Sequence, residues 1–124
     1  MLFKELVGLV LSSVVYDKDN EEIVITSATG DIYKLYHGQD CCEYVEVEDI
    51  CGDLGDLVGH PVLYAEESSN DECVGLDGVE DSEHWGSFTW TFYKIATIKG
   101  SVTIRWYGES NGYYSEEVSF RKVT

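Results

Sequence analysis

The sequence predicts a mainly β protein, a curved antiparallel sheet or small β-sandwich with one short helix near residues 48–57. Segments rich in β-branched and aromatic residues recur along the chain, and short polar or glycine-containing connections separate them. Apolar residues make up 44% of the chain and aromatic residues 13%, enough to build a folded core. The length of 124 residues is typical of one domain, so we expect residues 1–124 to form a single domain.

The first third of the chain predicts a three-stranded meander that follows an opening turn. Residues 9–16 are rich in β-branched and aromatic side chains, and a polar turn follows them. Residues 22–26 and 31–36 form two further candidate strands around a short connection that contains Gly30. Glycine readily takes the positive φ that tight hairpin connections require, which favours antiparallel pairing of these strands.

The middle of the chain predicts a helix, a strand and a long loop. Apolar residues in segment 48–57 recur at helical intervals, and its two glycines weaken the helix. Residues 61–65 form the next candidate strand, with proline at the first position, where a missing N–H donor is tolerated. Residues 66–86 are acidic with little periodicity, so we expect a surface loop.

The last third predicts three consecutive antiparallel strands, over residues 87–97, 102–107 and 113–121. The first is apolar on both of its sides, and we expect it to be central and covered on both faces. A three-residue loop between the second and third strands would pair Ile104 with Val118, apolar against apolar.

The same register predicts a face that carries binding groups. It pairs Arg105 with Glu117 as a cross-strand ion pair, and it leaves Arg105, Tyr107 and Tyr113 on one side of the sheet. This side could be packed in the fold or form a recognition surface.

The charge is strongly negative and unevenly distributed. The formal net charge is −16, and no Lys or Arg stands between Leu35 and Tyr93, a span that holds fifteen acidic residues. Direct binding to a nucleic-acid backbone is disfavoured, because phosphate contacts require clustered Lys and Arg. The longest apolar stretch, residues 6–11, is far too short to cross a bilayer, and we see no leader peptide. We expect no membrane association and a cytoplasmic location.

The segment from His37 to Glu43 holds the densest cluster of reactive groups. His37 could lower the pKa of Cys41 or Cys42 to give a nucleophilic thiolate, but no orienting third group is identifiable. Zinc could bind the same thiols and imidazole, although no pair of cysteines is spaced for it. The acidic loop lacks the residue order of a calcium-binding EF-hand. A turn with reduced thiols is the simplest interpretation, and we expect no cofactor.

Segment 106–115, Trp-Tyr-Gly-Glu-Ser-Asn-Gly-Tyr-Tyr-Ser, is the most distinctive part of the chain. Aromatic residues around a polar tip can stabilise a hairpin, or they can anchor a partner with few rotors to freeze. The candidate binding residues come from this segment and from the His37 cluster. They are Arg105, Tyr107, Asn111, Tyr113, Tyr114, His37 and Asp40.

Four segments together resemble a family of small uncharacterised proteins of bacteriophages and prophages. They are His37-x-x-Asp-Cys-Cys-Glu43, Asp49-x-x-Gly-Asp-Leu54, Thr91-Phe-Tyr93 and Arg105-Trp-Tyr-Gly-x-Ser-Asn-Gly-Tyr-Tyr-Ser115. The resemblance spans most of the chain and implies a viral accessory protein in the bacterial cytoplasm, but it implies no activity.

The functional hypotheses follow from this resemblance and from the charge. By analogy with other small acidic phage proteins, we expect a non-enzymatic binder that inhibits a host defence protein. Three alternatives stay open. The protein could sequester a nucleotide signalling molecule, mimic DNA with its carboxylates, or act as a Cys/His or metal-dependent enzyme.

Overall fold

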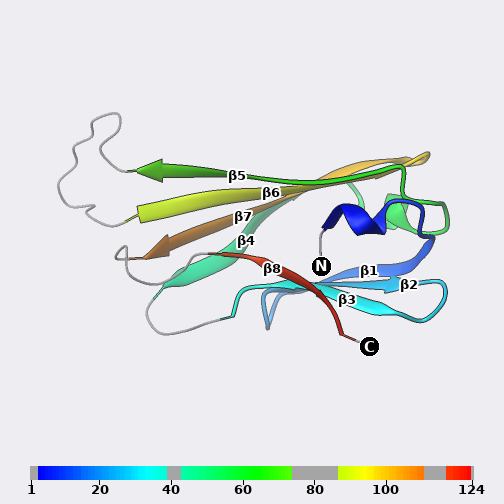
Figure 1. Cartoon of the computed structure of the whole chain (residues 1–124), viewed down its shortest axis with the longest axis horizontal. Coiled ribbons are helices and arrows are strands. Elements are labelled where there is room, and N and C mark those ends of the chain that lie inside the picture. Colours follow the sequence, from blue (N-terminus) through cyan, green and yellow to red (C-terminus); the bar gives the residue numbers. More distant parts are fainter. Residues whose placement is uncertain (1–2, 39–42, 74–86, 111–116, 124) are drawn as a thin grey trace.

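The computed structural model describes residues 3–38, 43–73, 87–110 and 117–123, with the backbone alone for residues 70–73 and 87. The protein is mainly β, as predicted, and consists of two four-stranded antiparallel sheets that face each other like a sandwich (Figure 1). The first sheet has the strand order β1-β2-β3-β8, and the second has the order β4-β7-β6-β5.

The strands of the first sheet are short, and those of the second are longer. The first sheet contains β1 (Leu11–Asp17), β2 (Glu22–Ser27), β3 (Ile32–Tyr36) and β8 (Ser119–Lys122). The second contains β4 (Tyr44–Cys51), β5 (Tyr64–Cys73), β6 (Ser87–Thr97) and β7 (Gly100–Ser110). Two single-turn 3₁₀ helices complete the described elements, η1 (Phe3–Leu6) and η2 (Leu54–Leu57).

The core lies between the two sheets, because alternate side chains of each strand point inward. Ile23 and Ile25 of β2 are buried on one side, and Ile104 and Trp106 of β7 on the other. Phe3 of η1 joins the layers, since its ring lies 4.8 Å from that of Tyr93 in β6 and 5.3 Å from that of Phe120 in β8. The N-terminal turn therefore fills the space between the sheets near β5 (Figure 1).

The predicted N-terminal meander is confirmed. Strands β1, β2 and β3 pair consecutively and antiparallel, and Gly30 between β2 and β3 has a φ of +98°. Buried and part-exposed residues alternate along β2 and β3, which is the pattern of strands with one face on a core.

Two predictions for the middle of the chain are wrong. The expected helix over residues 48–57 is the end of β4 followed by the single turn η2, because residues 48–51 continue to pair with β7. The strand expected at 61–65 begins instead at Tyr64 and runs to Cys73, through the first part of the expected loop. The acidic residues there belong to an edge strand, where charge is well tolerated. The remainder of the expected loop, residues 74–86, lies outside the described residues.

The predicted hairpin between β7 and the last strand is also wrong. Strand β7 pairs with β6 on one edge and with β4 on the other, so β8 joins the first sheet beside β3. Val118 is buried, but it does not face Ile104 across a strand pair. Strand β6 is central, as expected. Its outward side chains are nevertheless part-exposed, so it is not covered on both faces.

Within the residues that the structure describes, there is no helix long and apolar enough to span a membrane.

Candidate functional site

The side of the second sheet that faces away from the first sheet, here called the outer face, gathers most of the distinctive side chains. Inward residues such as Tyr93 and Ile104 are buried, and the residues next to them point outward. The outer face of the two central strands therefore consists of Phe88, Trp90, Phe92, Lys94, Thr103, Arg105, Tyr107 and Glu109.

Three aromatic rings form one cluster on this face. Trp90 of β6 and Tyr107 of β7 are direct cross-strand partners, and their ring centroids lie 4.7 Å apart at an interplanar angle of 53°. The ring of Phe88 lies 6.2 Å from that of Tyr107. All three residues are part-exposed. Most monomeric proteins bury such rings or use them to bind a partner, so this aromatic cluster is the leading candidate for a contact surface.

Arg105 lies beside the aromatic cluster and is already neutralised. Its guanidinium carbon lies 5.2 Å from the ring centroid of Trp90, within the range of a cation–π contact. Its Nε donates a hydrogen bond of 2.7 Å to Oε1 of Glu48, and a terminal nitrogen contacts the same oxygen. The predicted ion pair of Arg105 with Glu117 is thus replaced by one with Glu48, because β4 and not β8 is the neighbour of β7.

A β-bulge in β4 places Glu48 where it can reach Arg105. The pairing of β4 with β7 shifts register between Val47 and Asp49, so Glu48 is the extra residue. The N–H of Val47 donates to Oε1 of Glu21, 2.8 Å away in the β1–β2 turn. The same carboxylate accepts from the hydroxyl of Tyr16, and burial together with this carboxylate raises the pKa of Tyr16 to about 12. The bulge is therefore held by a contact between the two sheets.

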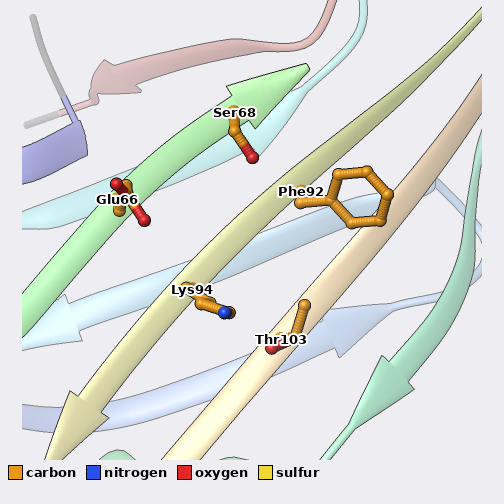
Figure 2. Close-up of a pocket in the computed structure, with 5 residues that line it drawn as sticks. All are labelled: Glu66, Ser68, Phe92, Lys94 and Thr103. Carbon is orange, nitrogen blue, oxygen red and sulfur yellow. The ribbon is translucent and has the colours of Figure 1, made fainter. Parts of the chain in front are cut away.

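A shallow pocket lies on the outer face next to the aromatic cluster. Its volume is about 160 Å³, and Figure 2 shows its lining side chains projecting from three adjacent strands. The lining residues are Glu66, Ser68, Phe92, Lys94 and Thr103. Pockets for drug-sized ligands measure roughly 300–1,000 Å³, so this one is suited to a side chain of a partner or to a very small molecule.

The polar groups of the pocket differ in how far they are engaged. The hydroxyl of Tyr64 donates a hydrogen bond to Glu66. No ion pair joins Lys94 to any carboxylate in the described part of the chain. The pocket therefore offers one cation and two hydroxyls beside the Phe92 ring (Figure 2).

His37 is buried away from the outer face and is bonded at both ring nitrogens. Its Nδ1 lies 2.7 Å from the carbonyl oxygen of Glu117 and therefore donates to it, while Nε2 lies 2.6 Å from Oε2 of Glu43. The side chains of His37 and Glu43 are only 6% and 0% exposed. This His37–Glu43 pair connects the end of β3, the start of β4 and the segment before β8. These contacts indicate that the pair stabilises the fold.

Six residues that the sequence singled out lie outside the described residues. They are Asp40, Cys41, Cys42, Asn111, Tyr113 and Tyr114. The structure brings Arg105 and Tyr107 onto one face and separates both from His37. Among the described residues, no group of three or more His, Cys, Asp or Glu side chains is arranged to hold a metal ion.

Sequence reasoning missed Phe88, Trp90 and Phe92 as surface residues. These residues alternate with Tyr93 and Ile95 in the sequence, so the strand has two apolar sides. The pattern does not indicate which of the two sides the fold covers. The acidic residues in the segments that form β4 and β5 could have indicated that this side is exposed. Strands beside a face that the fold buries carry fewer charges.

The fold and the outer face define an antiparallel β protein that carries a cluster of aromatic side chains on its surface, with glutamates on the strands around it. The chain belongs to the family described as a domain of unknown function, DUF7448, whose model matches residues 1–120. This confirms the expectation of an uncharacterised family; the phage origin stays a prediction. No curated protein and no solved structure matches the chain.

Proposed function

We propose that this protein is a non-enzymatic binding protein whose outer face holds a partner protein. Following the resemblance to phage proteins, we further propose that it is a phage accessory protein and that its partner is a host defence factor, which it inhibits in the bacterial cytoplasm. The observation that carries the binding proposal is the part-exposed aromatic cluster of Phe88, Trp90 and Tyr107. Trp, Tyr and Arg dominate the energy of protein interfaces, and all three meet here.

The electrostatics favour a basic partner. Glu46, Glu48 and Glu109 lie on the strands around the aromatic cluster, and the whole chain has a net charge of −16. A basic surface would be steered to this face, and the encounter would be faster at low ionic strength.

A protein partner is better supported than a nucleotide. The guanidinium of Arg105 is paired with Glu48 and so attracts a phosphate weakly. The pocket beside the aromatic cluster is about 160 Å³, smaller than a nucleotide site requires. Lys94 is the one cation among the described residues that line this pocket, whereas phosphate recognition uses several charged donors.

The bonding of His37 supports a structural role over activation of a cysteine. A general base needs a ring nitrogen that can accept a proton from the nucleophile. Both nitrogens of His37 are engaged, one by the Glu117 carbonyl and the other by the Glu43 carboxylate.

A quantitative pull-down from bacterial lysate tests the binding proposal. The double variant Trp90→Ala plus Tyr107→Ala should recover at least about 30-fold less of the partner that the wild type binds. A reduction of this size is expected when the central aromatic hot spot of an interface is removed. The matched control removes two exposed apolar side chains elsewhere, Val15→Ala plus Ile98→Ala, and should leave recovery unchanged. Circular dichroism establishes that both variants are folded.

The alternatives give different outcomes in the same assay. Equal recovery by both double variants would show that the outer face is not the contact surface. A partner retained by the outer-face variant but lost steeply as salt rises would indicate DNA mimicry through carboxylates. A nucleotide that copurifies with the wild type and is lost with Tyr107 would indicate sequestration.

A further inference from the structure

Each sheet of this protein has two edges, and three of the four edge strands carry features that discourage the addition of another strand. Strand β1 has a register shift between Leu11 and Ser13, and β4 has the bulge between Val47 and Asp49. Strand β8 has only four residues. Bulged and short edge strands are the usual protection against unwanted pairing.

Strand β5 is different, because it is long and regular. It pairs with β6 without interruption from Tyr64 to Cys73, ten residues or roughly 33 Å, and contains no proline. It is the outermost strand of its sheet, along the top of the molecule in Figure 1. No strand of the described residues pairs with its other side. Helix η1 lies near its first residues, where Phe3 and Lys4 line one pocket together with Ala65, Glu66 and Glu67 of β5.

The charge of β5 restricts which strand could be added. Four of its ten residues are acidic, namely Glu66, Glu67, Asp71 and Glu72, and none is basic. A second copy paired antiparallel about the centre of the strand would set Glu66 of each copy opposite Asp71 of the other and so oppose like charges. A basic strand would instead meet a carboxylate at each of these positions.

We propose that the free edge of β5 accepts an extended, basic segment of a partner protein as an additional antiparallel strand. Main-chain hydrogen bonds along the edge would supply the affinity, and the attraction of Lys or Arg side chains to this acidic strand would supply the selectivity. This inference goes beyond the outer face and does not depend on it, since an added strand continues the sheet and leaves the aromatic cluster uncovered.

The test uses the full chain and three synthetic peptides about as long as β5. The first peptide alternates Lys with Val and Thr, the second has Glu in place of each Lys, and the third keeps the lysines but has proline at alternate positions. The first should bind at least about tenfold more tightly than either other peptide, because the edge requires both positive charge and free backbone N–H groups. It should also slow hydrogen exchange at amides of β5.

Charge variants of the chain locate the binding site. The change Asp71→Asn plus Glu72→Gln should weaken the first peptide about fivefold or more. The change Asp19→Asn plus Asp49→Asn alters the net charge equally, in the β1–β2 turn and on β4, and should have little effect. Tyr107→Ala, which disrupts the outer face, should bind the peptide like the wild type.

Four results would overturn the inference. Equal binding of the proline-containing peptide would mean that charge alone is recognised. Protection of β4 amides instead of β5 amides would place the site at the opposite edge. Loss of peptide binding in Tyr107→Ala would assign the peptide to the outer face. A dimer in sedimentation experiments that β5 variants dissociate would show that a second copy occupies the edge.

Discussion

At the scale of single residues, the His37–Glu43 pair shows how a cluster that resembles a reactive site serves the fold. Both side chains are almost fully buried, and the 2.6 Å separation of Nε2 and Oε2 requires a proton between them. A buried carboxyl group that loses a hydrogen-bond partner is costly, because it retains the desolvation penalty without the bond. The pair therefore stabilises the junction of β3, β4 and β8 only while both members are present.

The prediction at this scale is that His37→Ala lowers the free energy of unfolding by about 3 kcal/mol or more. Glu43→Gln should cost less, about 1–1.5 kcal/mol, because the neutral amide can still bond to the imidazole. Urea unfolding of both variants and of the double variant measures the coupling between the two residues. A loss below about 1 kcal/mol for His37→Ala would show that the pair does not stabilise the fold.

At the scale of elements, the connection from β4 through η2 depends on close backbone approach. Gly52 has a φ of +122°, and a Cβ added there would lie 2.6 Å from the carbonyl oxygen of Ser101. The side chain of Asp53 then accepts from the N–H of Gly55 and caps the turn, while Thr97 donates a 2.6 Å bond to the carbonyl oxygen of Asp56. These bonds fix η2 beneath the β6–β7 hairpin.

We expect Gly52→Ala to lower the free energy of unfolding by about 2 kcal/mol more than Gly59→Ala. Both glycines have positive φ, but a Cβ at Gly59 would meet open space. The control therefore carries the backbone strain alone, and the difference measures the steric clash with Ser101. Thermal unfolding of the two variants side by side is the measurement. Equal losses would mean that the β7 backbone moves aside without cost.

At the scale of the whole molecule, the charge of −16 opposes folding through self-repulsion. Among the described residues, three surface ion pairs act in the other direction. They join Lys34 to Glu22, Arg105 to Glu48, and Lys122 to Asp31. Exposed pairs contribute only about 0–1 kcal/mol each, so repulsion among the 24 acidic residues should dominate the salt response.

The expected result is that NaCl stabilises the protein. Between about 20 and 500 mM salt the screening length falls from roughly 20 Å to 4 Å, and Tm should rise by about 3–6 °C. The variant Asp19→Asn plus Asp49→Asn starts with less repulsion and should gain less. Scanning calorimetry compares the two proteins; a Tm that falls with salt would show that the ion pairs outweigh the repulsion.

The sequence by itself determined the features that depend on neighbouring residues. The turn at Gly30 needs a positive φ, and the alternation of β2 and β3 gives each strand one buried side, so the meander could be predicted locally. Strand β6 was predicted with the bounds that the structure has, Ser87–Thr97, and its central position in the sheet was predicted as well.

Only the tertiary structure decided which strands pair and which faces stay open. The hydrophobic pattern of β7 suits several partners. The strand that follows it in sequence, β8, does not pair with it, because β6 and β4 occupy both edges of β7. Arg105 therefore pairs with Glu48 and not with Glu117, and β8 pairs with β3. The same choice exposes the Trp90 and Tyr107 rings, since a strand with two apolar sides does not specify which side the second sheet will cover.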